Sequence, residues 1–266
     1  MTVAARVALA GLLLCGAPTV RAQDFVDPAP ASRGTSALRL LEQGLPDAHP
    51  GASVATAFTR WWGLPELTTR TVAGELAWHS LRLASGLARS GEPALGWSTV
   101  AFAIGVVGDD TGVALRGAVR LDRDAPWTLV RASSPASGLE CGAGAWLCPA
   151  HAVRVWVSAP QLARGGPAPP LMRPLECGVR MGEASAVWCT LRAPHEGDDG
   201  MRALGAALEL APVLVWVELR DAPLRAATGL SLAVAGGTIA WRLDDHPVLG
   251  ETVRLAFAWH GGGGRP

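Results

Sequence analysis

Large apolar side chains alternate with small or polar ones along most of the chain after Thr68. Within residues 112–122, for example, aliphatic residues such as Leu115 alternate with small or charged residues such as Arg116. A period of two indicates β-strands whose two faces meet different surroundings. Clusters of Gly, Asp and Pro separate the alternating runs, which is the pattern of consecutive hairpins.

The length of these runs distinguishes between two all-β architectures. Strands of soluble proteins are typically about 5–6 residues long, whereas strands that cross a membrane need about 9–11. The runs match the longer class and predict an antiparallel up-and-down transmembrane β-barrel of about 10–12 strands. A soluble secreted or periplasmic β-sandwich acting as a binding module is the alternative, because a sheet with one wet face shows the same alternation.

Charged residues follow the alternation closely and keep to the face with small side chains. In a barrel that face surrounds the lumen, where an arginine avoids the cost of about 2–4 kcal/mol that it meets at the centre of the lipid. The residues predicted to line the lumen are Arg82, Arg116, Arg120, Arg154, Glu218, Arg220, Arg242, Asp244 and Arg254. Their excess of positive charge indicates either an anion-favouring pore or a plugged barrel with paired charges, and the many Gly, Ala and Ser between them favour the plugged interior.

The N-terminal part of the chain has a different pattern. Residues 1–22 resemble a signal peptide, with Arg6 before a short apolar core and a cleavage site before Gln23. Residues 23–63 predict a leader or plug segment that contains a short helix over residues 36–44, closed by glycine, and a second short helix at 53–62. The predicted barrel covers residues 64–260, and residues 261–266 are a tail.

The composition agrees with a membrane barrel whose only abundant aromatic residue is tryptophan. The 266 residues include 11 Trp and no Tyr, and the net charge of zero gives no reason to expect a nucleic-acid partner. Aromatic side chains form girdles at the two membrane interfaces of barrels. The residues predicted for these girdles are Trp78, Trp97, Trp127, Trp188, Trp241, Phe257 and Trp259.

Four cysteines remain after the predicted signal: Cys141, Cys148, Cys177 and Cys189. An even number of cysteines in an exported chain predicts disulfides. Local pairs, 141 with 148 and 177 with 189, would each close one hairpin, although three connectivities remain open.

Motifs of catalysis are absent from the sequence. It has no Gly-x-Ser-x-Gly elbow, no His-Glu-x-x-His and no phosphate loop, so we predict no enzyme and no cofactor. Two weaker alternatives are a zinc cluster of Cys141, Cys148 and His151, and a hydrolase that uses residues 244–246. A calcium loop at residues 195–199 lacks the alternating ligand pattern.

The two ends of the predicted mature chain carry a resemblance to a known family. Residues 245–254, Asp-His-Pro-Val-Leu-Gly-Glu-Thr-Val-Arg, resemble the closing hairpin of the PorV and PorQ-like branch of the FadL-type outer-membrane proteins. Residues 57–67 occupy the place of that family's segment after the signal. The resemblance implies a monomeric outer-membrane barrel with a role in solute uptake or in the transfer of secreted proteins.

The prediction from all these features is an outer-membrane β-barrel with a structural, small-solute transport or secretion-associated role in the cell envelope. Its expected surroundings are outer-membrane lipid and other envelope or secretion components. The periplasm or the exterior is the alternative location, and we expect no metal site.

Overall fold

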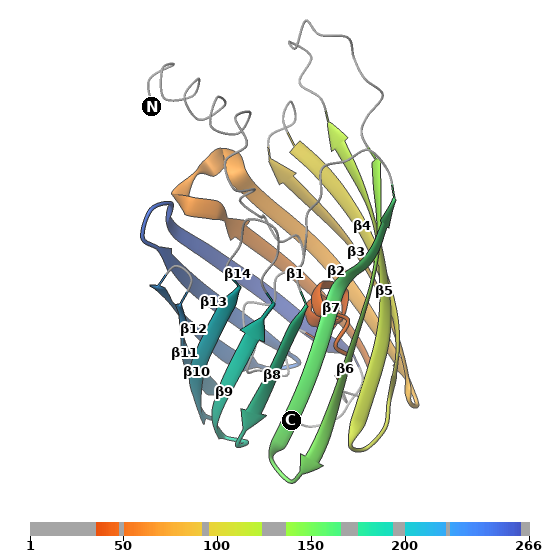
Figure 1. Cartoon of the computed structure of the whole chain (residues 1–266), viewed down its shortest axis with the longest axis vertical. Coiled ribbons are helices and arrows are strands. Elements are labelled where there is room, and N and C mark those ends of the chain that lie inside the picture. Colours follow the sequence, from red (N-terminus) through yellow and green to blue (C-terminus); the bar gives the residue numbers. More distant parts are fainter. Residues whose placement is uncertain are drawn as a thin grey trace, which may run out of the picture.

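The alternating segments form strands that pair in chain order. The computed structural model describes residues 36–47, 51–91, 96–123, 137–165, 175–193, 200–221 and 224–261, and within these residues fourteen antiparallel strands close into one barrel (Figure 1). The strands are β1 (Gly51–Arg60), β2 (Thr68–Trp78), β3 (Leu81–Gly91), β4 (Gly96–Val107), β5 (Thr111–Arg123), β6 (Ser137–Ala150), β7 (Val153–Gly165), β8 (Glu176–Met181), β9 (Ser185–Arg192), β10 (Met201–Leu210), β11 (Val213–Asp221), β12 (Leu224–Val234), β13 (Gly237–His246) and β14 (Gly250–Gly261). The prediction of an up-and-down barrel is confirmed, with more strands than the predicted 10–12.

The additional strands come partly from a segment that we expected to be helical. Residues 53–62 belong mostly to β1, which pairs with β2 on one side and with β14 on the other and so closes the barrel. Val54 and Phe58 point outward and are exposed, whereas Ala55 and Thr59 are buried inside. The predicted second helix is therefore wrong, and the barrel begins within the segment assigned to the leader. Only two short 3-10 turns, η1 (Trp61–Gly63) and η2 (Pro65–Leu67), follow β1.

The two faces of the wall differ as the alternation predicts. On β5, Val113 and Leu115 are exposed on the outside, while Ala114, Arg116 and Ala118 are buried inside. The exposed large apolar residues occur on the outer face of strands all around the barrel. No helix among the described residues is long and apolar enough to cross a membrane.

The two ends of the barrel differ in their connections. Both chain ends of the barrel, Gly51 and Gly261, lie at the end where short turns join the strands, as between Trp78 and Leu81. We call this end the turn end. Longer connections, such as residues 124–136 between β5 and β6, join the strands at the opposite end, called the loop end.

The short helix predicted near the N-terminus is present inside the barrel. Helix α2 (Ser36–Gln43) contacts the strands from β1 to β7, and Figure 1 shows it within the ring of strands. Leu38, Leu40 and Leu41 are fully buried against alanines of the inner wall, including Ala101 and Ala114. The small inner residues of this half of the wall therefore make room for a helix.

Candidate functional site in the barrel lumen

The helix and the residues after it, 36–47, form a segment that we call the plug. Gly44 ends the helix with a positive φ of 67°, and its amide donates to Leu40 O at 3.0 Å. The chain then runs close to β6, where a Cβ added at Gly144 would lie 2.6 Å from Gln43 O. A glycine at position 144 therefore permits this close approach.

The inner wall supplies hydrogen-bond donors to the carbonyl groups of the plug. Arg82 Nε donates to Asp47 O at 3.0 Å and Arg116 Nε to Leu41 O at 2.6 Å. Trp146 Nε1 donates to Pro46 O at 2.6 Å, and Ser158 Oγ to Gln43 O at 2.6 Å. Carbonyls at the end of a helix have no partner within the helix, and a buried one is costly without a donor. Four strands thus hold the plug by its backbone.

Side chains of the plug add contacts on both sides. Ser36 Oγ lies 3.5 Å from Ser53 Oγ on β1, and Gln43 Nε2 donates to Glu176 Oε1 on β8 at 3.4 Å. Asp47 lies within ion-pair distance of Arg39, at 3.7 Å, and of Arg154, at 3.9 Å. The plug is attached to the wall on opposite sides of the lumen.

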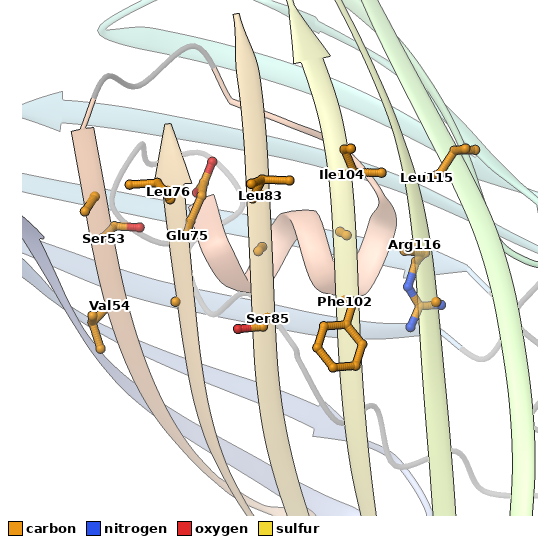
Figure 2. Close-up of a pocket in the computed structure, with 15 residues that line it drawn as sticks. Ser53, Val54, Glu75, Leu76, Leu83, Ser85, Phe102, Ile104, Leu115 and Arg116 are labelled. Carbon is orange, nitrogen blue, oxygen red and sulfur yellow. The ribbon is translucent and has the colours of Figure 1, made fainter. Parts of the chain in front are cut away.

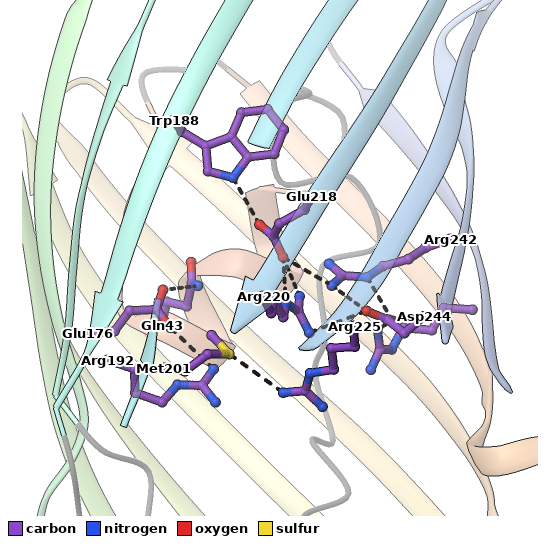
Figure 3. A network of polar contacts seen from close by, with 11 residues as sticks. Gln43, Glu176, Trp188, Arg192, Met201, Glu218, Arg220, Arg225, Arg242 and Asp244 are labelled. Carbon is purple, nitrogen blue, oxygen red and sulfur yellow. Dashed lines mark hydrogen bonds and ion pairs between the residues drawn. The ribbon is translucent and has the colours of Figure 1, made fainter. Parts of the chain in front are cut away.

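A network of buried charges occupies the half of the wall that the helix does not cover (Figure 3). Asp244 accepts two hydrogen bonds from Arg242, at 2.7 and 2.9 Å, a short one from Arg254, and forms an ion pair with Arg220 at 3.3 Å. Glu218 accepts from Arg220 Nε at 2.7 Å and from Trp188 Nε1 at 2.9 Å. Two carboxylates thus neutralise part of the charge of three arginines.

Tryptophan rings cover glycines on the neighbouring strand at four places on the inner wall. The directly paired residues are Trp146 with Gly112, Trp156 with Gly178, Trp188 with Gly205, and Trp216 with Gly229. A Cβ at any of these glycines would overlap the ring. Arg242 in turn lies over the Trp216 ring, 4.9 Å from its centroid. The glycines allow the rings to lie against the wall and leave space in the lumen.

This packing predicts the effect of adding one methyl group. Gly205→Ala is expected to lower the free energy of unfolding by about 1–3 kcal/mol, because the Trp188 ring must move and its bond to Glu218 is strained. Urea titration of the detergent-solubilised protein measures this change. Gly117→Ala is the matched control, since its Cβ would lie 3.8 Å from the nearest atom, Glu140 O. Equal effects of the two substitutions would show that the ring does not depend on the glycine.

A cavity of about 160 Å³ lies between the plug and the charged wall. The charged side chains that line it are Arg39, Glu42, Arg154, Glu176, Arg180, Arg192, Glu218, Arg220 and Arg242. Arginines outnumber carboxylates in this set, and Trp146, Trp156 and Trp188 provide apolar walls. The cavity therefore favours a small anion.

All nine charged residues predicted for the lumen lie on its inner face, and they divide into groups. Five of them, Glu218, Arg220, Arg242, Asp244 and Arg254, form the network described above. Arg82, Arg116 and Arg154 contact the plug, and Arg120 lies over the Trp97 ring at 4.5 Å. Sequence reasoning missed Glu176, Arg180 and Arg192, and also Arg225, which shares the inner face of β12 with Ala227. Glu176 and Arg180 alternate with the outward Cys177 and Val179.

The residues predicted as an aromatic girdle separate into two groups. Trp78, Trp241, Phe257 and Trp259 point outward and are exposed. The prediction is wrong for Trp188, which is buried inside, and for Trp97, which shares the inner face with Thr99 and Ala101. Both rings contact lumen residues instead of lipid. Trp127 lies outside the described residues.

The predicted local disulfides are also wrong, because all four cysteines are free. Cys141 and Cys148 lie on one strand, β6, and point to opposite faces, so their sulfur atoms cannot meet. Cys177 pairs with Leu191 and Cys189 with Val179, which makes this second pair diagonal neighbours rather than opposite ones.

The structure also bears on the alternative zinc and hydrolase sites considered from the sequence. Among the described residues, no three His, Cys, Asp or Glu side chains form a group that could hold a metal ion. Asp244 is enclosed by arginines, while Asp245 is exposed and His246 Nδ1 accepts from the amides of Val248 and Leu249. The hydrolase arrangement is thus not formed, and residues 195–199 lie outside the described residues.

A larger depression, of 790 Å³, lies on the outer wall (Figure 2). It is lined by exposed apolar side chains of neighbouring strands, among them Leu76, Leu83 and Phe102, around Ser85. These residues belong to the same apolar outer face that covers the rest of the barrel. We therefore place the candidate site in the smaller lumen cavity, where polar groups converge.

The outer surface and the closed hydrogen bonding identify the type of protein. A backbone in lipid must satisfy its polar groups internally, which a closed barrel achieves by pairing every strand. Fourteen is an even number, as in single-chain outer-membrane barrels, and the outer face is apolar. The chain is an outer-membrane β-barrel.

Comparisons with known proteins give similarity of architecture only. No protein family and no curated protein matches the chain. The outer-membrane protein Omp33 of Acinetobacter baumannii is 8% identical with a TM-score of 0.49, and the match covers 79% of this chain and 98% of that one. A triple mutant of the Rhodopseudomonas blastica porin is 8% identical with a TM-score of 0.40, and the match covers 78% of this chain and 98% of that one. The KdgM porin, in complex with disordered oligogalacturonate, is 6% identical with a TM-score of 0.44, and the match covers 79% of this chain and 99% of that one.

Proposed function

We propose that this barrel is a narrow, non-enzymatic outer-membrane channel for small anions, constricted by its own N-terminal plug. The observation that carries the proposal is the cavity between the plug and the arginine-rich wall of β8 to β13. By analogy with other outer-membrane barrels, the turn end faces the periplasm and the loop end the exterior. In this orientation the plug lies in the lumen, and β1, the strand that follows it, begins at the periplasmic end of the barrel.

The positive charge of the lumen supports selectivity for anions over cations. Arg39, Arg180 and Arg192 line the cavity in addition to the arginines of the Asp244 network. Rings of arginine or lysine are the usual basis of anion selectivity in pores, because they lower the energy of an anion where water is scarce. Carboxylates such as Glu176 reduce the excess of positive charge around the cavity without reversing it.

The size of the lumen supports restriction to small solutes. Barrels of 16–18 strands leave an aqueous channel, and about 8 strands leave only enough room for side chains. A barrel of fourteen strands without a plug would therefore be open. The helix occupies part of that space, and the cavity between it and the charged wall measures about 160 Å³.

A secretion-associated docking role is the second candidate function. It rests on the resemblance of residues 245–254 to the closing hairpin of PorV and PorQ-like proteins, and the plugged lumen is compatible with it. In that case the barrel serves as a membrane anchor and conducts no ions. The same electrical experiment separates the two candidates.

Reconstitution into a planar bilayer under a KCl gradient tests the proposed selectivity. We expect a reversal potential that indicates chloride preference, and we expect Arg180→Glu to reduce this preference because Arg180 lines the cavity. Arg202→Glu is the matched control: it makes the same charge change on an arginine whose side chain is 81% exposed. A cation preference of the unmodified protein would contradict the proposal, and complete absence of conductance would favour the docking role.

A further inference from the structure

One lumen arginine differs from the others in its surroundings. The only hydrogen bond of Arg225 in the described part of the chain goes to the sulfur of Met201, at 3.5 Å, and its buried Nε has no partner there. A thioether is a weak acceptor, whereas a guanidinium is suited to two parallel bonds with a carboxylate or phosphate. Arg225 is therefore a donor without a matching acceptor.

The residues around Arg225 increase the positive charge at this place. Arg225 is directly paired with Arg220 across β11 and β12, and Arg192 is paired with Met201 across β9 and β10. Figure 3 shows Arg192 and Arg225 on either side of Met201, near the loop end. Like charges opposite each other on two strands destabilise a sheet. A bound anion would remove this repulsion.

Among the described residues, the carboxylates near Arg225 are bound to other arginines. Glu218 and Asp244 pair with Arg220 and Arg242, and Glu176 lies 3.5 Å from Arg192. Asp244 is the carboxylate with an electrostatic effect on Arg225, but its oxygens accept from Arg242 and Arg254. No carboxylate in the described ranges neutralises Arg225 directly, so its charge is available to a ligand.

We propose that Arg225, together with Arg192 and Arg220, forms a binding subsite for a small dissolved oxyanion, a carboxylate or a phosphate. This inference rests on the proposed anion channel and gives its substrate class. Met201 and Arg192 both line the lumen cavity, so an ion bound here lies at the loop-end side of that cavity. Entering anions would be held at this position before they pass the plug.

Inorganic phosphate and acetate, titrated into the detergent-solubilised full chain, test the subsite by calorimetry. We expect saturable binding of at least one of them, and a loss of affinity of about tenfold or more in Arg225→Gln, because a charged hydrogen-bond pair is removed. Arg225→Lys keeps the charge but not the paired donors and should bind with intermediate affinity. Arg202→Gln, on the exposed side chain, should bind like the unmodified protein.

Thermal unfolding separates a ligand site from a merely structural arginine. A ligand that binds only the folded state raises its stability, and the gain grows with the logarithm of the ligand concentration above the Kd. We therefore expect the bound anion to raise the melting temperature of the unmodified protein clearly more than that of Arg225→Gln at the same anion concentration. An equal rise in both proteins, or no saturable binding of either anion, would overturn the proposal.

Bilayer recordings keep this proposal distinct from the channel function. If the same anion blocks the chloride current at concentrations near the dissociation constant measured by calorimetry, both the subsite and the channel are supported. Anion-selective current without saturable binding would overturn the subsite and leave the channel. Saturable binding that depends on Arg225, with no current, would support the subsite and contradict the channel.

Discussion

Deleting residues 36–47 is expected to raise the single-channel conductance about threefold or more. The deletion removes a helix about 10–12 Å wide from a barrel that is large enough to hold water without it. The fully buried Leu38, Leu40 and Leu41 show how much of the lumen the helix fills. Bilayer recordings of the deletion variant beside the unmodified protein measure the change. The alanines of the inner wall would then line an open pore, and the anion preference should fall because Arg39 is removed.

A crosslink offers a control that leaves the plug in place. Ser36 and Ser53 have their hydroxyl oxygens 3.5 Å apart, so cysteines at both positions can form a disulfide. The four cysteines of the barrel are replaced by serine in this variant. Its oxidised form should keep the low conductance of the unmodified protein at every voltage. Unchanged conductance after deletion of the plug would show that something else closes the lumen.

The alternation predicted most of the wall because it depends only on neighbouring residues. Leu115 and Arg116 reveal the two faces of β5 without knowledge of any other strand. Residues 36–43 were predicted as a helix closed by Gly44, and these local signals persist inside the barrel. β1 was missed although its outward side chains, Val54, Thr56 and Phe58, alternate with smaller ones, because Gly63 and Pro65 directly after it also fit the end of a helix.

The position of the plug could not be read from the sequence. The inner alanines indicate that a partner can come close, but they do not say which segment it is. Arg116 reaches Leu41 O, a residue 75 positions away, only after the barrel has closed. Residue type alone also misled the prediction for Trp188, which we assigned to the membrane interface. Its position on the same face as the small or polar Ala186 and Thr190 would have placed it inside.

The largest effect on stability is expected for Asp244→Asn. Asp244 contacts Arg220, Arg242 and Arg254, and it is the carboxylate that Arg254 pairs with in the described part of the chain. Removing one member of a buried ion pair costs about 3–5 kcal/mol, because the remaining charge is left without compensation. The free energy of unfolding in urea, and the temperature at which the folded band disappears on a gel, should both fall.

Asp245→Asn is the matched control, since the neighbouring carboxylate is exposed and should change stability by less than about 0.5 kcal/mol. The double variant Asp244→Asn, Arg254→Met should recover part of the loss, because it removes a buried charge together with its partner. If the double variant is as unstable as the sum of the two single ones, the pair is not coupled. Equal stability of Asp244→Asn and Asp245→Asn would mean that the buried arginines are solvated by water in the lumen, and the network would then contribute to selectivity rather than to folding.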